Sequence, residues 1–471
     1  MAAVEETAGP VNPLRGEAPP SPAGPAGDAD GLVPAPVLAG SSVGQSRGLI
    51  FNHFDFIERA RAKYGDVFRI NVLRRDFRMH VTSHPDSAKA LFLAKPDEAP
   101  SATGDSPLRP VVGPNTVLTA IGSRHLRQRK LLLPSFHGDA VDAYVASIER
   151  TVSAEIDRWR TGDTIELAPR MSDVTLDVIM AGVFGAEPPL EAGTPEAELR
   201  RLVRKSLALT TKPWWPLAEA PSLGHDSPRW PVRGQVQPVY DALDTLIRAR
   251  RAVPEAERGE DILSILLAAR DEDGVALTDE EIRMELLTLV LAGHETTANS
   301  LAWAMERLTR EPVAYSNLRE AVRVGGPEAD AYVDATIHEA MRLRPVVPMI
   351  GRRIQSDWSF GDKRVPAGSL VTVSIVLMHR REDLYPRPHD FLPERFIDAP
   401  PGTYEWMPFG GGIRRCLGAT LAMAEMRVVL RELTRRVDAS ADRPQPERER
   451  MRNVTLIPAR GGRVRVDRIV S

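Results

Sequence analysis

One stretch of the chain, residues 278–312, does more than any other to limit the fold. It opens on TDEE, residues 278–281, where Thr and Glu have the spacing of a capping box and so predict the start of a helix. No proline follows until Pro312, so the helix can continue for over 30 residues. At 1.5 Å per residue it would span about 48 Å. A helix of that length crosses a whole domain, and the other elements must pack around it.

The segments around this helix predict a mostly helical domain with a smaller β region. Apolar residues recur every three or four positions in residues 139–160, which is typical of an amphipathic helix. Residues 328–344 predict another helix, whereas residues 67–70, 79–82 and 358–378 predict strands and turns. The predicted fold class is therefore mainly α with a minor β region (α+β), in a single large domain.

Two segments rich in proline interrupt this pattern. Residues 1–46 are rich in Pro, Ala and Gly, so they bury too little apolar surface to offset the entropy cost of ordering. We expect a disordered tail at 1–46 and a domain at 47–471. Residues 211–233 predict a long connection between helices. Trp214 and Trp215 within it suggest either an apolar lip beside a binding site or anchors that pin the connection to the core.

Charge and cysteine content exclude several classes of protein. The 61 basic and 64 acidic residues give a net charge of −3, without the basic excess of a nucleic-acid-binding protein. A single cysteine, Cys416, excludes a disulfide framework and a cysteine-rich zinc site, and fits a reducing compartment.

The longest apolar run in a helical context, residues 286–293, is far shorter than the ~18 residues that a bilayer requires. With no signal peptide at the N-terminus, we expect a cytoplasmic protein without a membrane span.

The surroundings of Cys416 favour a charged thiolate. It lies in FGGGIRRCLG, residues 409–418, where glycines allow a close backbone approach and arginines supply positive potential. The next residues predict a helix, whose N-terminal dipole favours negative charge. The thiol could be a core residue, a nucleophile or a metal ligand. A nucleophile needs a base such as histidine, and none lies near it in the sequence, so ligation beside a macrocycle fits better.

This cysteine stretch resembles the haem-binding signature of the cytochrome P450 family, Phe-x-x-Gly-x-Arg-x-Cys-x-Gly. The fixed positions of that signature fall on Phe409, Gly412, Arg414, Cys416 and Gly418. In the family a cysteine thiolate is the axial ligand of the haem iron. The resemblance covers roughly residues 50–465. It implies a single helical domain with a long central helix across the haem, haem b as the cofactor, and Cys416 as the metal ligand.

A second motif lies within the long helix. The sequence AGHETT, residues 292–297, resembles the family element that lies over the oxygen-binding face. The small Ala292 and Gly293 leave room for a ligand. Glu295 and Thr296 form an acid–alcohol pair that can relay protons during dioxygen activation, so the resemblance makes them the catalytic residues. Without the resemblance, the same pair also fits a solvated acid and a threonine that bends the helix.

A third motif is a structural triad. Glu339 and Arg342 are three positions apart and share one helix face. Arg395 belongs to PERF, residues 393–396, at the place where the family completes a buried triad. The resemblance implies that these three residues hold the cysteine loop in position.

A fourth group of residues matches the propionate-binding positions of the family. His125 and Arg129 are four apart and therefore face the same side of a helix. Arg414 fits the same role, and Arg352 is expected to join them, although the adjacent Arg353 competes for it. Read alone, the pair at 125 and 129 also fits a basic helix face in solvent.

The resemblance implies a soluble bacterial haem-dependent monooxygenase that hydroxylates or epoxidises a small, mainly apolar substrate. The chain has no flavin or iron–sulfur module, so we expect electrons from a separate ferredoxin and its ferredoxin reductase, and we expect a monomer. The expected basic docking face comprises Arg124, Arg127, Lys130 and Arg415. The expected pocket walls are residues 101–119, 211–233, 348–350 and 455–456. A peroxide-driven haem-thiolate enzyme and a non-catalytic haem sensor or carrier remain alternatives.

Overall fold

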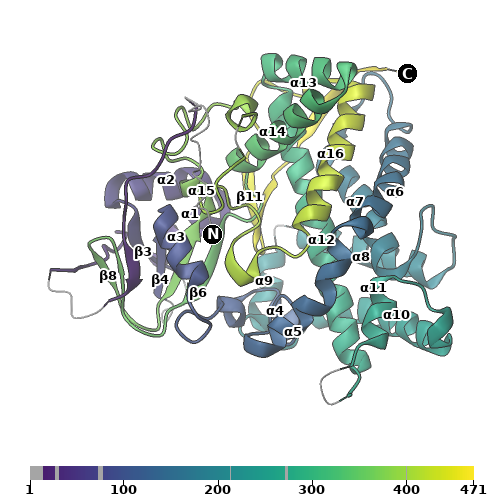
Figure 1. Cartoon of the computed structure of the whole chain (residues 1–471), viewed down its shortest axis with the longest axis horizontal. Helices are drawn as coiled ribbons and strands as arrows, with labels where there is room; N and C mark the ends of the chain where they lie inside the picture. The colour runs from purple at the N-terminus through teal and green to yellow at the C-terminus, as the bar shows by residue number, and fades with distance from the viewer. Residues whose placement is uncertain are drawn as a thin grey trace, which may run out of the picture.

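The computed structural model describes residues 14–26, 31–72, 78–212, 214–270, 274–398 and 400–470. The long helix is α12 (Asp279–Leu308), which runs through the middle of the molecule in Figure 1. Its capping box is confirmed, because the Thr278 side chain accepts from the N–H of Glu281 while the Glu281 carboxylate accepts from the N–H of Thr278. The helix ends at Leu308, before Pro312.

The other helices pack around α12, which contacts α7 most extensively. The expected helices at 139–160 and 328–344 are confirmed as α6 and α14. The remaining helix bounds are α1 (Ser42–Phe51), α2 (His53–Tyr64), α3 (Pro85–Leu93), α4 (Arg109–Val112), α5 (Gly122–Leu132), α6 (Asp139–Ile156), α7 (Leu167–Phe184), α8 (Pro195–Thr210), α9 (Trp215–Glu219), α10 (Val232–Ala252), α11 (Ile262–Ala268), α13 (Pro312–Val324), α14 (Pro327–Leu343), α15 (Ile375–Met378) and α16 (Ala419–Arg436).

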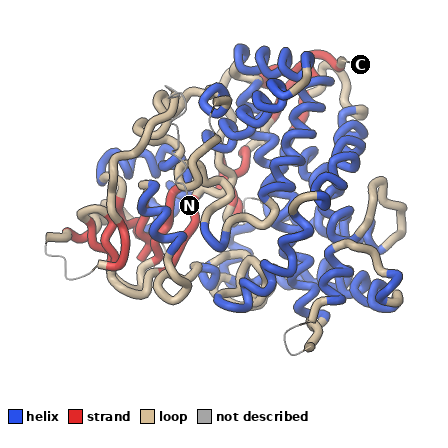
Figure 2. Tube along the Cα trace, in the orientation of Figure 1, coloured by secondary structure: helices blue, strands red, loops and turns tan. Residues whose placement is uncertain are grey.

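The strands form small sheets that gather mainly on one side of the molecule, and most helices lie on the other (Figure 2). The largest mixed sheet has the order β3 (Val67–Asn71), β4 (Arg78–Thr82), β9 (Leu370–Ser374) and β6 (Met349–Arg353). A second four-stranded sheet has the order β1 (Ala23–Pro25), β7 (Trp358–Phe360), β8 (Lys363–Val365) and β2 (Val33–Pro34). A three-stranded sheet has the order β10 (Val437–Ala441), β13 (Arg463–Ile469) and β5 (Thr164–Glu166). A two-stranded sheet consists of β11 (Glu449–Arg452) and β12 (Thr455–Pro458). The expected strands at 67–70 and 79–82 are therefore confirmed.

The N-terminal segment differs from the expected disordered tail. Strand β1 pairs with β7 and strand β2 pairs with β8, while α1 begins at Ser42. The N–H of Gly16 donates to the carbonyl oxygen of Leu384 over 3.0 Å. The structure thus contradicts the prediction for the described residues up to 46, because main-chain hydrogen bonds to distant segments order a stretch with few apolar side chains. Residues 1–13 and 27–30 lie outside the described residues.

The proline-rich connection at 211–233 is partly helical. It contains α9 and a short 3-10 helix, Ala220–Ser222, before α10 begins. Trp215 is buried in the apolar cluster beneath it, whereas half of the Trp214 surface, 50%, is exposed. Both sequence interpretations therefore hold in part, since one tryptophan pins the connection to the core and the other faces outward.

The apolar core lies on both sides of α12. One cluster joins α12 to α6, α7, α14 and α16, and another joins it to α7, α8, α10 and α11. The apolar run at 286–293 supplies buried side chains to the second cluster, which explains its composition without a membrane. Within the described part of the chain, no helix is both long enough and apolar enough to cross a bilayer.

Candidate functional site

The cysteine loop is closed by main-chain contacts. The N–H of Cys416 donates to the carbonyl oxygen of Phe409 over 2.8 Å, just before α16 begins. Gly412 has a φ of 63°, and a Cβ there would overlap the carbonyl oxygen of Phe92 in α3. Glycine is therefore required for this close approach. The close backbone approach that the sequence predicted for these glycines is therefore, at Gly412, an approach to the protein's own main chain.

Gly418, the last signature residue, is in a different situation. Its φ is −90°, and a Cβ at this position would be 3.8 Å from the Phe136 ring, an ordinary contact. Its N–H donates to the sulfur of Cys416. Gly418 thus contributes a main-chain donor at the start of α16 rather than a conformation that other residues cannot adopt.

The thiol of Cys416 is accessible, yet protein crowds around its sulfur. Burial is the largest influence and raises the pKa of the thiol above its ordinary value, although the N–H of Gly418 and the charges of Arg415 and Arg129 act to lower it. The donors that the sequence predicted are therefore present, but burial outweighs them in the protein by itself. A bound metal ion would supply the further positive charge that keeps a coordinating thiol deprotonated.

Three arginines and a histidine lie together at the cysteine loop. They are His125 and Arg129 of α5, Arg352 of β6, and Arg414 of the loop itself. Burial lowers the pKa of His125 to about 4, with further lowering by the charges of Arg414, Arg129 and Arg352. Burial also lowers the pKa of Arg352 and of Arg414 to about 10 in each case. The structure thus brings together residues that are far apart in the sequence.

Within the part of the chain that the structure describes, no carboxylate pairs with these arginines. Among the described residues, Arg129, Arg352 and Arg414 form no ion pair with a carboxylate; they donate only to carbonyl oxygens. Arg129 donates to Arg415 over 2.7 Å, Arg414 to Leu118 over 3.2 Å, and Arg352 to Gly351 over 3.1 Å. A half-buried positive cluster is costly without counter-ions. Such a cluster fits a cofactor that carries two carboxylates, and haem carries two propionates.

The competition between Arg352 and Arg353 is decided by their surroundings. Arg353 forms an ion pair with Asp105 and donates to the carbonyl oxygen of Gly368 over 2.8 Å. Arg352 is 5% exposed, and its guanidinium lies 4.6 Å from the centre of the Phe92 ring. Arg352 is therefore the one of the two that remains able to bind an added anion.

The AGHETT segment presents its small residues in two directions. Ala292 is exposed, and Thr296 Oγ1 donates to its carbonyl oxygen over 2.9 Å. A Cβ on Gly293 would lie 2.7 Å from Cδ1 of Ile179, because α7 packs closely against this face of α12. Gly293 thus allows α7 to pack closely without displacing the Ile179 side chain, whereas Ala292 keeps an accessible face of the helix small.

Glu295 is held by the β11–β12 hairpin. Arg452 approaches its carboxylate at 2.6 Å through Nη2 and donates from Nε over 2.9 Å, while Thr455 Oγ1 donates to Oε1 over 3.0 Å. Arg452 is a candidate functional residue whose contact with Glu295 sequence reasoning missed, because 157 residues separate the two. The acid of the acid–alcohol pair is therefore oriented by a segment near the C-terminus.

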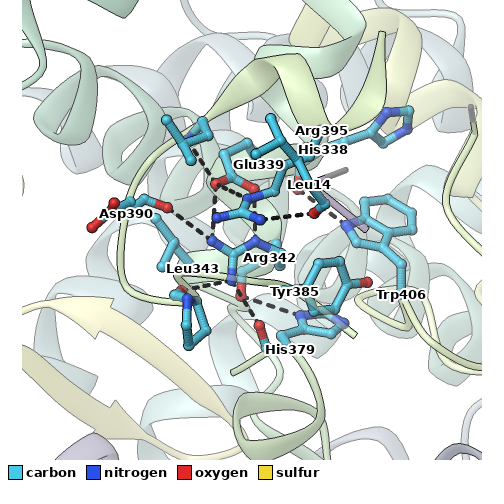
Figure 3. Close-up of polar contacts among 12 residues, drawn as sticks. Leu14, His338, Glu339, Arg342, Leu343, His379, Tyr385, Asp390, Arg395 and Trp406 are labelled. Atoms are coloured by element: carbon cyan, nitrogen blue, oxygen red, sulfur yellow. Dashed lines mark hydrogen bonds and ion pairs between the residues drawn. The ribbon is translucent and has the colours of Figure 1, made fainter. Parts of the chain in front are cut away.

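The triad assembles in the core as the sequence predicted. Glu339, Arg342 and Arg395 are all 0% exposed. Arg342 binds the Glu339 carboxylate through both Nε (2.6 Å) and Nη2 (2.9 Å), and Arg395 Nε lies 3.3 Å from Oε1 (Figure 3). The remaining donors reach carbonyl oxygens, including those of Pro388 and Asp390. A buried charge network that is satisfied in this way fixes the connection leading to the cysteine loop.

His379 connects this triad to the cysteine loop. Its Nδ1 lies 3.2 Å from the carbonyl oxygen of Arg342 (Figure 3). Its Nε2 accepts from the N–H of Met407 over 2.9 Å. Burial, aided by the charge of Arg342, lowers its pKa to about 3, so the ring is neutral. Met407 lies just before Phe409, the first signature residue. No motif marked this histidine in the sequence.

Three of the expected pocket walls lie near these residues. Ser101 forms a bridge with Arg352, and the carbonyl oxygen of Leu118 accepts from Arg414, so residues 101–119 border the cationic cluster. Ile350 lies against Gly410 of the cysteine loop. Thr455 contacts Glu295.

In the expected basic docking face, Arg124 is ion-paired with Glu281 of α12.

Comparison with known proteins identifies the family. The family model for Cytochrome P450 matches residues 40–465. The chain belongs to the cytochrome P450 family. Its members are haem-thiolate monooxygenases, so this P450 is an oxidoreductase of that kind. Cytochrome P450 135B1 of Mycobacterium tuberculosis is 37% identical over 93% of this chain and 91% of its own length. Cytochrome P450 137 of the same species is 36% identical, over 86% of this chain and 83% of its own.

Solved structures have the same fold as this P450. The retinoic-acid-bound cyanobacterial CYP120A1 superimposes with a TM-score of 0.77 at 24% identity, covering 93% of this chain and 100% of that one. The haem domain of cytochrome P450DA gives a TM-score of 0.76 at 20% identity, over 93% and 98% of the two chains. The predicted fold class, mainly α with a minor β region, is confirmed.

Proposed function

We propose that this P450 binds haem b through Cys416 and oxidises a small, mainly apolar substrate by hydroxylation or epoxidation. The observation that carries the proposal is the cluster of Arg129, Arg352 and Arg414 beside the chain's single thiol, which has no carboxylate partner among the described residues and surrounds the neutral His125. The arginines would hold the propionates, and the Cys416 sulfur would be the axial ligand. When bound, the haem supplies the activation of dioxygen and the transfer of one oxygen atom to the substrate.

The protein's part in this chemistry is to move protons and to exclude excess water. Thr296 Oγ1 has an accessible position on α12, next to Ala292. Glu295 precedes it on the helix and is oriented by Arg452 and Thr455. The carboxylate of Glu295 would take protons from solvent, and the Thr296 hydroxyl would pass them to the reacting oxygen. Arg452 acts as a positioning residue, since it touches Glu295 and not the reacting atoms.

Electrons would come from separate proteins, a ferredoxin and a ferredoxin reductase. Members of the family typically use redox partners. The exposed Arg415 next to Cys416 offers positive charge to an acidic ferredoxin, with Arg127 and Lys130 on the adjacent α5. We further propose that the enzyme acts as a monomer.

The assignment of Cys416 is tested by the spectrum of the reduced protein with carbon monoxide. The wild-type protein should give the red-shifted absorption band of a haem thiolate, and Cys416→Ser should abolish it. A band that survives the substitution would refute Cys416 as the ligand. The apoprotein titrated with haem gives an independent check, because binding is then measured without catalysis.

The proton relay is tested by the ratio of product formed to reductant consumed. Thr296→Ala should lower this ratio several-fold, since the hydroxyl is lost while the helix remains. Thr297→Ala is the matched control, because Thr297 is buried on another face of α12. An equal ratio of product to reductant in wild type and Thr296→Ala would contradict the relay.

Turnover with hydrogen peroxide at the rate of the reductase system would favour a peroxide-driven enzyme instead.

A further inference from the structure

A second concave site lies apart from Cys416. It is a groove of ≈ 1070 Å³ between the α1–α2 region and the segment that leads into β11. Its floor includes Arg307, Arg344 and Arg380, and its wall includes Phe51 and Phe54. None of the cofactor-binding residues proposed above lines it. The groove therefore needs an explanation of its own.

Arg344 at the floor of this groove lacks an anionic partner. Among the described residues its only side-chain hydrogen bond is from Nη1 to the carbonyl oxygen of Leu343, over 3.2 Å, and it forms no ion pair. Its Nε is buried without a partner. The guanidinium lies 5.0 Å from the centre of the Phe54 ring and 5.4 Å from that of Trp303. This charge is thus held between aromatic faces without a carboxylate in contact with it.

The neighbouring arginines add to this positive charge instead of relieving it. Arg307 pairs with Glu311 and Arg380 with Glu58, so each has one carboxylate of its own. Each also has a buried Nε without a hydrogen-bond partner. Burial, followed by the charges of Arg380 and Arg307, lowers the pKa of Arg344 to about 9.

Nearby carboxylates are already engaged elsewhere. Glu306 binds Arg310, and Glu449 accepts from the N–H of Phe54 over 3.1 Å. Neither forms an ion pair with Arg344. Glu306 and Glu449 act to raise the pKa of Arg344 from a distance, but of the three guanidinium groups at the floor only Arg344 has no carboxylate bound to it among the described residues.

The walls restrict which anion can supply that charge. Phe51 is 62% exposed and Phe54 stacks beneath Arg380, 4.2 Å from its guanidinium, so one side of the groove is apolar. Asp55, Glu447 and Glu449 also line the groove and are matched in number by Arg47, Arg59 and Arg448, so the unpaired Arg344 leaves a place for a single negative charge. We propose that the groove binds a small amphipathic monocarboxylate, with its head at Arg344 and its apolar chain along Phe51.

The proposal is tested by calorimetric titration of the haem-loaded, full-length protein with decanoate. Saturating imidazole occupies the haem iron throughout, so that binding there does not contribute. Decanoate should bind at least about tenfold more tightly than decan-1-ol, which lacks the charge, and than inorganic phosphate, which carries up to two charges. Equal affinity for decanoate and decan-1-ol would overturn the role of the arginines.

Two variants localise the binding. Arg344→Met should weaken decanoate binding at least about tenfold, whereas Arg59→Met, an exposed arginine of the same groove, should change it less than about threefold. Phe51→Glu alters an exposed side chain with little risk to folding, and should weaken binding by a similar factor. Unchanged affinity in Phe51→Glu and in folded Arg344→Met would refute the site. Phosphate binding as tightly as decanoate would refute the preference for a monocarboxylate.

Discussion

Arg352 and Arg353 are adjacent in sequence and have opposite electrostatic surroundings. Arg353 points to Asp105, whereas Arg352 joins Arg414 and His125 without a carboxylate partner among the described residues. Adjacent residues of a strand face opposite sides of a sheet, so a single position in register decides which of the two arginines lies beside Arg414 and His125. Electrostatic partners therefore favour Arg352 as the arginine proposed to bind the cofactor, where the sequence leaves two candidates.

Replacing these two arginines should have unequal effects on haem retention. Arg352→Leu removes a charge-assisted bond to a propionate, worth about 1.5–3 kcal/mol, so haem should dissociate at least about tenfold faster. Arg353→Leu is the control and should leave the dissociation rate within about threefold of wild type. Transfer of haem to apomyoglobin measures both rates. Equal rates in the two variants would contradict the assignment of Arg352.

His379 makes a separate prediction about pH. Its pKa is lowered from 6.5 to about 3 in the folded protein. Between these values the unfolded chain binds a proton that the folded state excludes, so the free energy of unfolding falls as the pH falls. The contribution is up to about 1.4 kcal/mol per pH unit.

The variant His379→Gln cannot take up this proton. Its free energy of unfolding, from urea titrations followed by the haem circular dichroism band, should depend less steeply on pH below 6.5. At neutral pH it should be less stable by about 1 kcal/mol, since a hydrogen bond to Met407 or Arg342 is weakened. The same pH slope in both proteins would contradict the low pKa of His379.

At the scale of elements, the cysteine loop is defined by what packs against it. Helix α3 contributes the Phe92 carbonyl oxygen that excludes a side chain at Gly412, and α7 contributes Ile179, whose side chain would have to move to admit one at Gly293. The β11–β12 hairpin contributes Arg452, which orients Glu295. The small and charged residues of the motifs are thus matched to neighbouring elements as much as to a cofactor.

Gly412 and Gly418 offer a matched pair of substitutions in this loop. Gly412→Ala combines a φ of 63° with an overlap at Phe92, so it should lower the free energy of unfolding by about 2 kcal/mol or more. Gly418→Ala should cost less than about 1 kcal/mol, because its φ is −90° and the nearest atom is 3.8 Å away. Urea unfolding and the fraction of haem-loaded protein measure the difference. Equal losses would show that the Phe92 contact does not constrain the loop.

At the scale of the whole molecule, the N-terminal segment supports the core that holds the cysteine loop. The carbonyl oxygen of Leu14 accepts from Nη1 of Arg395 over 2.9 Å, so this segment completes the hydrogen bonds of the buried triad (Figure 3). Arg15 binds the Glu405 carboxylate at 2.8 Å. The family model begins only at residue 40, so these contacts belong to a part of the chain that precedes the matched region.

The packing of the N-terminal segment against the core can be tested by adding one methyl group at Gly16. A Cβ at Gly16 would overlap the carbonyl oxygen of Asp383, so Gly16→Ala should displace the segment and lower the free energy of unfolding by about 1–3 kcal/mol. Gly24→Ala in β1 is the control, since a Cβ there would meet no atom within 4 Å. Thermal unfolding of the haem-loaded proteins measures both. Equal stability of Gly16→Ala and wild type would show that the segment does not contribute to the fold.

By itself, the sequence determined the features that depend on short spacings. The α12 capping box, the α14 pair of Glu339 and Arg342, and the signature around Cys416 could all be predicted, because caps, helix faces and tight turns are set by residues a few positions apart. The family, the fold class and most candidate site residues followed from these.

Only the tertiary structure decided which distant residues meet. It selected Arg352 over Arg353, joined Arg452 to Glu295, linked His379 to Met407, and ordered the described residues of an N-terminal segment that composition alone assigned to a tail. Each of these contacts joins segments separated by many residues or depends on a strand's register. Their geometry is set by how α12 and the sheets pack, which no local pattern in the sequence contains.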